Sequence, residues 1–349
     1  MMEPLSAPQQ LTRADFEFTG SGGEYFRIWI VNIALTVLTL GVYSAWAKVR
    51  RLQYFYRNTR VADASFDYHG RPLAILKGRV VAVALLFLYN LALEFQSLLA
   101  LVIAVPVVPV LPWLLRQSLR FRLHYSSWRG LRFAFHGGTA GAYRVFMLWP
   151  ILSFASFYLL GPMWHQRLKR YQHGNAAFGA TPFAISAGVG AFYRPYLVAL
   201  GGLILLTVVA LPAALALTAG VRAGYARQFM TAFGVLGVLG AGFMVLIGPY
   251  LMSRIQNLVW NTTTLGPHRF RCRLRARSLA WIGGTNLLLI VLTLGLYLPF
   301  AAVRLARYRA SCTSLLPGSA LDEFVASEKA GVAALGEELG ELLDIDISL

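Results

Sequence analysis

Long runs without charge are the feature that most constrains how this chain folds. Residues 195–221 and 228–253 contain no charged residue, and between Arg79 and Arg116 the only charge is Glu94. A helix that crosses a bilayer needs about 20 predominantly apolar residues, and these runs are long enough. Only 13% of the residues are charged and the mean hydropathy is +0.57, whereas soluble domains have about 25% charged residues. The sequence therefore predicts a polytopic membrane protein.

The longest apolar runs form two pairs. Residues 73–93 and 98–115 are separated only by 94–97, and a second pair lies at 195–217 and 229–251. A short link between two apolar runs indicates an antiparallel arrangement of the two helices. We therefore predict two transmembrane hairpins. The first 24 residues have no apolar core, so we expect no cleaved signal peptide.

Shorter apolar segments between these hairpins belong to an internal repeat. A shift of 117 residues superposes Phe16 on Phe133 and Asn58 on Asn175, and a shift of 254 superposes Asn32 on Asn286. A fragment that begins at Arg254 also echoes the one that begins at Arg51. We expect the repeated signature residues to be structural; they are Gly41, Asn58, Phe66, Gly70, Asn175, Asn261 and Gly295.

These patterns predict an all-α polytopic membrane protein with three degenerate repeat units, which alternate with the two transmembrane hairpins, and with short cytoplasmic β-strands. Each unit would hold a strand, an apolar segment that re-enters or spans the membrane, and a basic, aromatic helix. The predicted divisions are a polar tail with a short strand (1–24), unit 1 (25–72), hairpin 1 (73–116), unit 2 (117–194), hairpin 2 (195–252), unit 3 (253–320) and an acidic amphipathic tail (321–349).

The distribution of Arg and Lys favours re-entrant unit segments. If the segments bend near Gly41, Gly161 and Gly295, the four most basic loops share the cytoplasmic side, as the positive-inside rule requires. Seven ordinary spans are the alternative. In the re-entrant arrangement, short strands lie on one side and could pair in a small sheet; they contain Phe16, Phe66, Phe133, Phe183 and Phe270.

The first unit also carries a resemblance to a known family. The stretch IWIVNIALTVLTLGVYSAWAKVRRLQYFYRNT, followed by FDYHGRPLAILKGR, resembles the signature of the YjgN-like family of bacterial inner-membrane proteins, which carry a domain of unknown function. The resemblance is clearest over residues 24–79 and weakens in the later units. It implies an inner-membrane location and a shared architecture. It supplies no catalytic residues.

The chain has few groups for catalysis. Between residues 68 and 321 the only carboxylate is Glu94, so paired-carboxylate catalysis and acidic metal sites have no candidates there. A meeting of Asp67, His69 and His136 is conceivable, but loop histidines of this kind usually have solvating or capping roles. We expect no enzyme activity, no catalytic residue, no metal and no cofactor.

Two non-catalytic functions remain from the sequence. Transport or permeation of a solute would use Asn32 and Asn286, which occupy equivalent positions in two units; hydrogen bonds that tie the segments to neighbouring helices are the structural alternative. A lipid-binding or membrane-organising role would use a collar of Arg and aromatic residues for anionic phospholipid headgroups. The collar candidates are Trp46, Arg50, Arg51, Tyr54, Arg167, Arg170 and Arg304.

The charge balance separates the tail from the rest of the chain. The chain has a net charge of +17, yet residues 321–349 contain eight acidic residues and one Lys. The basic residues cluster at the ends of apolar helices, which argues against nucleic acid as a partner. Apolar tail residues at helical spacing predict an amphipathic helix. This helix would dock on the basic cytoplasmic face of the protein or recruit a partner.

Overall fold

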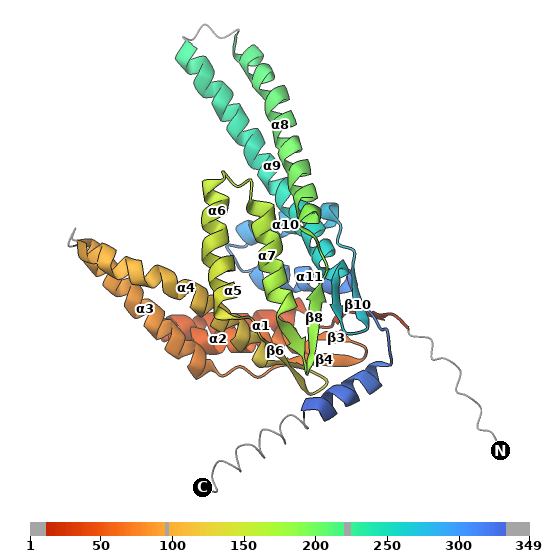
Figure 1. Ribbon diagram of the computed structural model, residues 1–349. Helices are drawn as coiled ribbons and strands as arrows, with labels where there is room; N and C mark the ends of the chain where they lie inside the picture. Colours follow the sequence, from red (N-terminus) through yellow and green to blue (C-terminus); the bar gives the residue numbers. More distant parts are fainter. Residues whose placement is uncertain (1–11, 95–97, 220–224, 333–349) are drawn as a thin grey trace, which may run out of the picture.

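The computed structural model describes residues 12–94, 98–219 and 225–332 (Figure 1). Its centre is one antiparallel sheet of eleven short strands, in the order β1-β11-β10-β9-β8-β7-β6-β5-β4-β3-β2. The strands are β1 (Ala14–Asp15), β2 (Glu17–Phe18), β3 (Thr59–Val61), β4 (Ala64–Tyr68), β5 (Ser126–Trp128), β6 (Leu131–Phe135), β7 (Ala176–Phe178), β8 (Thr181–Ile185), β9 (Thr263–Leu265), β10 (His268–Cys272) and β11 (Thr313–Leu316).

Four β-hairpins with two-residue turns build most of this sheet. Ala62 and Asp63 both have positive φ, as do Arg129 and Gly130. In the other two turns Gly179 and Gly266 supply the positive φ. Turns with positive φ match the right-handed twist of the flanking strands, which is why two-residue hairpins favour them.

The two edges of the sheet are joined by one short segment near the N-terminus. β1 pairs with β11, and β2 pairs with β3. Only Phe16 separates β1 from β2, and its N–H donates to the Thr313 carbonyl at 3.0 Å. Residues 14–18 therefore join both edges and close the strands into a ring.

Phenylalanines fill the inside of the ring. Phe66 lies 6.2 Å from Phe16 and 6.3 Å from Phe133 between ring centroids, and the series continues through Phe183 to Phe270 at 6.4 and 6.2 Å. Phe66, Phe133, Phe183 and Phe270 sit on alternate strands, whose backbones are about 9.6 Å apart. Since their rings are closer together than the backbones that carry them, the side chains converge on the concave face. The Phe-bearing strands do lie in one sheet, but they do not pair with one another, because β5, β7 and β9 stand between them.

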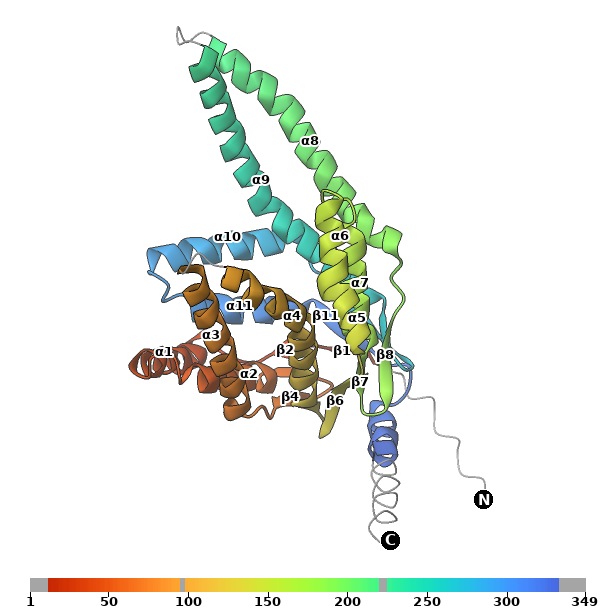
Figure 2. The same cartoon turned by 60° about the vertical axis from the view of Figure 1, so that its left-hand side comes forward.

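Five helical hairpins leave the ring and return to it (Figures 1 and 2). Each is followed in the chain by strands of the sheet. They are α1 (Gly22–Leu38) with α2 (Ser44–Arg57); α3 (Pro72–Glu94) with α4 (Leu98–His124); α5 (Thr139–Tyr143), the π-helix η1 (Arg144–Leu148) and α6 (Trp149–Ala155) with α7 (Gly161–Gly174); α8 (Val189–Ala219) with α9 (Tyr225–Asn261); and α10 (Ala276–Leu292) with α11 (Leu298–Ser311).

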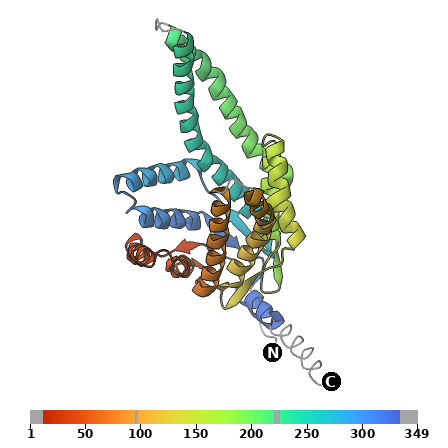
Figure 3. The same ribbon diagram turned by 90° about the vertical axis from the view of Figure 1, so that its left-hand side faces the viewer.

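Neighbouring hairpins are in contact all around the ring. α2 contacts α3, α4 contacts α5, α7 contacts α8, and α9 contacts α10. The last helix, α11, contacts α1, so the helices close a ring as the strands do. The pair α8 and α9 projects beyond the other helices in every view (Figure 3).

Three hairpins are short and share one turn. In the first and last, Leu40–Gly41 and Leu294–Gly295 have positive φ. At the equivalent positions of the middle unit Phe157 and Tyr158 adopt the same conformation without glycine. The bend predicted near Gly161 is therefore misplaced by three residues, and Gly161 begins α7 instead. The turns expose large apolar residues, among them Leu40 (96% exposed) and Leu294 (95% exposed).

The predicted fold class is wrong. The protein is not all-α, because the eleven-stranded sheet organises it. Within the described ranges two helices are long and apolar enough to cross a membrane, at Val189–Ala216 and Phe229–Asn261; the segment predicted as the first transmembrane hairpin is not among them. The residues assigned to three units and two transmembrane hairpins form five helical hairpins, each followed in the chain by strands of the sheet.

The tail helix over 321–332 covers the turn end of the strand ring. Val325 is buried in the cluster that contains Val61, Trp128 and Phe178. Glu328 is also buried, and its carboxylate accepts hydrogen bonds from the N–H groups of Ala180 and Thr181 at 2.6 and 3.1 Å. The described part of the tail thus docks on the protein itself. Five acidic residues of the predicted tail lie outside the described residues: Glu337, Glu338, Glu341, Asp344 and Asp346.

Candidate anion-binding site

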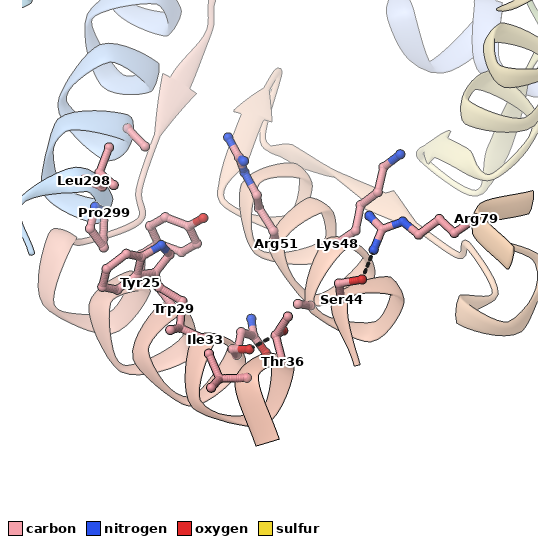
Figure 4. Close-up of a pocket in the computed structure, with 14 residues that line it drawn as sticks. Tyr25, Trp29, Ile33, Thr36, Ser44, Lys48, Arg51, Arg79, Leu298 and Pro299 are labelled. Atoms are coloured by element: carbon pink, nitrogen blue, oxygen red, sulfur yellow. Dashed lines mark hydrogen bonds between the residues drawn. The ribbon is translucent and has the colours of Figure 1, made fainter. Parts of the chain in front are cut away.

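The main candidate site is a cavity at the seam where the first and last hairpins meet. We call it the seam cavity. It has a volume of about 650 Å³ and is lined by α1 and α2, by Arg79 of α3, and by Leu298, Pro299 and Ala302 of α11. Trp29, Ile33 and Val37 of α1 contribute apolar wall. Figure 4 shows the side chains around it.

Cations dominate the polar groups of the seam cavity. Lys48 and Arg51 extend from α2, and Arg79 reaches from α3 to hydrogen bond with the Ser44 hydroxyl (Figure 4). Lys48 and Arg79 also line a neighbouring cavity of about 680 Å³, to which α4 adds Arg120. Asp and Glu do not occur among the described residues that line either cavity. The arrangement is suited to an anionic group with an apolar part.

Asn32 brings an unpaired acceptor to the seam cavity. Its side chain is buried, with 6% exposed. No described residue donates a hydrogen bond to its Oδ1. The neighbouring Thr36 hydroxyl donates to the Asn32 backbone carbonyl and not to the side chain. A buried acceptor without a donor costs about 1–3 kcal/mol, which a bound donor would relieve.

Asn286, the second predicted polar residue, lies elsewhere. It is buried between α10 and α11, where its Nδ2 donates to the Ala301 carbonyl at 3.4 Å and its Oδ1 accepts from Arg304 at 3.2 Å. It does not line the seam cavity. The structure therefore does not bring Asn32 and Asn286 into one described cavity.

The predicted collar divides into exposed and internal residues. Arg50 and Arg170 are exposed, and Trp46 is half-buried against Tyr43, with ring centroids 6.1 Å apart. Arg51 is exposed and lines the seam cavity. Exposed cations at such positions are available to headgroups.

The other collar candidates contact the protein itself. Arg167 lies over the Trp149 ring at 5.7 Å, and Arg304 donates to Thr285 and Asn286. The buried Tyr54 hydroxyl donates to the Ser21 carbonyl at 2.8 Å. Burial, followed by a hydrogen bond to Glu24, raises the pKa of Tyr54 to about 12, so this phenol stays neutral.

The repeat signature residues have structural contacts. Asn58 ends α2 and donates from Nδ2 to the Tyr54 carbonyl at 2.8 Å; Asn175 makes the same bond to Tyr171 at 2.9 Å. Asn261 instead bonds both backbone groups of Cys272. The Tyr68 ring packs so closely against Gly70 that a Cβ there would lie 2.4 Å from it, and Phe66 belongs to the ring interior.

A second polar cavity, of about 760 Å³, opens beside β4 and β5. The structure brings His69 within 2.9 Å of the Ser127 hydroxyl and 3.9 Å of Asp67, but it does not place His136 in this cavity. Burial alone would raise the pKa of Asp67, yet hydrogen bonds from Arg57 and the Tyr68 N–H lower it overall. Ser127 is buried within a strand, a poor position for a nucleophile. Over 12–94, 98–219 and 225–332, no cluster of His, Cys, Asp and Glu could hold a metal ion.

Sequence reasoning found Asn32 and Arg51 but did not single out Lys48 or Arg79. Arg79 comes from the start of the first long apolar run and meets α2 only in the fold. Its position at the edge of an apolar run was the available signal, because cations there reach the membrane interface.

The fold and the cavity define a class: a membrane protein in which apolar helical hairpins surround a closed strand ring and carry a basic site. The chain belongs to a family described as bacterial proteins of unknown function (DUF898), whose family model matches residues 13–342. The expected family is thereby confirmed.

Named relatives agree with the membrane assignment. The chain is 30% identical over 143 residues to the inner membrane protein YjgN of Escherichia coli O157:H7, covering 39% of this chain and 35% of that protein. It is 28% identical over 145 residues to inner membrane protein YjgN of Salmonella typhimurium, covering 41% and 36%. The matched region thus spans about a third of the length of these relatives. No solved structure matches the chain.

Proposed function

We propose that this protein is a non-catalytic, multi-pass protein of the bacterial inner membrane that binds anionic phospholipid headgroups in the seam cavity. The observation that carries the proposal is the combination of Lys48, Arg51 and Arg79 in a cavity without lining acids. Arg and Lys near a membrane surface attract anionic lipids by about 1 kcal/mol each. The apolar residues of α1 that line the same cavity would contact the acyl chains.

Helix length supports a membrane position for the hairpin tips. α1 has 17 residues and is therefore about 25 Å long, less than the hydrocarbon core of about 30 Å. α8 and α9 have 31 and 37 residues, or about 46 and 55 Å. The long pair would cross the bilayer, while the short hairpins insert their exposed apolar turns and return. The strand ring, its basic loops and the tail helix would then lie on the cytoplasmic side, as the positive-inside rule favours.

Solute transport, the other function considered from the sequence, has weaker support. A path along the axis of the strand ring would meet the stacked phenylalanines and then the tail helix at Val325. The seam cavity lies among helices to one side of this axis. It has the composition of a headgroup site.

The test is lipid selectivity of the full chain in nanodiscs of mixed composition, read by native mass spectrometry of co-purified lipid. A triple substitution of Lys48, Arg51 and Arg79 by Gln should remove the enrichment of anionic over zwitterionic lipid. A matched triple variant in which the exposed sheet residues Arg132, Arg269 and Arg271 become Gln loses the same charge away from the cavity. Equal lipid profiles in the two variants would contradict the proposal.

A further inference from the structure

The first and last helical hairpins contain the same buried Asn in two different states. A shift of 254 residues places Asn32 on Asn286 and Arg50 on Arg304. In the last hairpin the Arg304 guanidinium donates to the Asn286 Oδ1 at 3.2 Å. The repeat thus shows an internal donor that satisfies this amide.

The first hairpin lacks that internal donor. Arg50 turns away and lies over the Tyr43 ring at 5.8 Å, where it is exposed. Within the part of the chain that the structure describes, the Asn32 Oδ1 has no partner although 94% of the residue is buried. Where the last hairpin has a guanidinium, the first has the seam cavity.

Charge decides which kind of donor suits Asn32. The seam cavity already contains Lys48, Arg51 and Arg79 and has no lining carboxylate among the described residues. A ligand ammonium would add a fourth positive charge in a partly desolvated site, where like charges repel strongly. A hydroxyl donates without adding charge, and a phosphate beside it would neutralise the cations.

We propose that the seam cavity selects a phosphate ester that carries a free hydroxyl, the chemistry of a phosphatidylglycerol headgroup. The hydroxyl donates to the Asn32 Oδ1, and Lys48, Arg51 and Arg79 bind the phosphate. This inference rests on the proposed binding of anionic lipid. It adds that the headgroup is recognised by a hydrogen bond as well as by charge.

The experiment compares three lipids with identical acyl chains in competition for the full-length protein in nanodiscs. Phosphatidylglycerol has the phosphate diester and the hydroxyl, phosphatidylmethanol has the same singly charged diester without the hydroxyl, and phosphatidylethanolamine has an ammonium. One net hydrogen bond corresponds to about 3- to 10-fold in affinity. We expect phosphatidylglycerol to exceed phosphatidylmethanol by this factor and both to exceed phosphatidylethanolamine.

Variants of Asn32 test whether this residue causes the preference for phosphatidylglycerol. Asn32→Leu should make phosphatidylglycerol and phosphatidylmethanol bind equally while anionic lipids remain favoured. Asn32→Gln, which keeps an amide oxygen, should retain part of the preference. Asn90→Leu is the matched control, because Asn90 is exposed on α3 and bonds only its own helix at Leu86. If Asn32→Leu does not fold, the wild-type ratio and Asn32→Gln still decide the question.

The outcomes separate two failures. Equal binding of phosphatidylglycerol and phosphatidylmethanol by the wild type, or an unchanged preference in Asn32→Leu, would overturn the headgroup inference and leave anionic-lipid binding intact. No preference for either anionic lipid would overturn the proposed function itself. Displacement of bound lipid by an equal concentration of soluble glycerol 3-phosphate would support the headgroup chemistry and overturn a membrane source.

Discussion

One buried carboxylate joins the tail helix to the sheet. Glu328 is 8% exposed. Besides its two backbone hydrogen bonds, it accepts one from the Thr181 hydroxyl at 2.5 Å. Gly179 makes room for it, since a Cβ at that position would lie 2.4 Å from the carboxylate. The turn between β7 and β8 is therefore shaped around this side chain.

We predict that Glu328→Gln releases the tail helix from the sheet. The substitution removes the charge that strengthens three hydrogen bonds, each worth about 1.5–3 kcal/mol when one partner is charged. It also turns an amide NH₂ toward backbone N–H donors. Because the apolar contacts of Phe324 and Val325 remain, we expect the docked state to lose about 2–4 kcal/mol, which raises the undocked fraction roughly 30- to 700-fold.

Hydrogen exchange of the full chain measures this directly. Amides of residues 321–332 should lose protection in Glu328→Gln while amides in the central strands keep theirs. Glu323→Gln is the control, because Glu323 is exposed on the same helix and the change in charge is identical. If both variants exchange alike, buried hydrogen bonding does not hold the tail, and long-range attraction to the basic face would explain docking better. That attraction would also weaken in high salt, whereas the contacts seen here should resist it.

Three further predictions concern the turns, a buried histidine of α7 and the topology. Gly41→Ala should destabilise the protein by about 1–2 kcal/mol because Gly41 has a positive φ. Gly284→Ala is the control and should not destabilise it, since Gly284 lies inside α10 with open space around a Cβ. Unfolding curves of the detergent-solubilised variants measure both effects, and equal effects would contradict the turn assignment. Burial lowers the pKa of His173 to about 4, so the unfolded chain takes up a proton at a higher pH than the folded protein does. The free energy of unfolding should therefore fall from pH 6.5 toward pH 4, by about 1–2 kcal/mol near pH 5. A thermal midpoint that depends on pH as strongly in His173→Gln as in the wild type would refute this. Arg132→Cys, in a Cys312→Ser background, should react with an impermeant maleimide only after permeabilisation, and labelling in intact cells would reverse the proposed orientation.

The sequence was sufficient for the Phe-bearing strands and for their place in one sheet. Phe66 and Phe133 recur within short alternating patterns, and alternation is the signal of a half-buried strand. Their partner strands β3, β5, β7 and β9 have three residues each. Three residues are too few to show the alternation of apolar and polar residues that identifies a strand. One strand of every hairpin was therefore predicted and the other was missed.

The fivefold plan was hidden by differences in helix length. α8 and α9 look like an ordinary transmembrane pair because hydropathy dominates their sequence, yet they occupy the same place between strands as α1 and α2. The echo of Arg51 at Arg254 was the available evidence that α9 and α2 correspond. Local sequence could not show that residues 14–18 close the ring, since that pairing joins residues about 300 positions apart.

The position of the seam cavity follows from how the ring closes. Neighbouring hairpins elsewhere are linked by a covalent β-turn, but the first and last hairpins are held by the pairing of β1 with β11 and by the contact of α1 with α11. β1 contributes only two residues to that pairing, so this joint has fewer constraints than the other four. A ligand held between α1, α2 and α11 binds the closed ring and not the open one. By mass action it stabilises closure by about 2.7 kcal/mol at a hundredfold excess over its dissociation constant. The proposed headgroup binding would therefore be coupled to ring closure at the seam, and its loss should loosen β1 before any other strand.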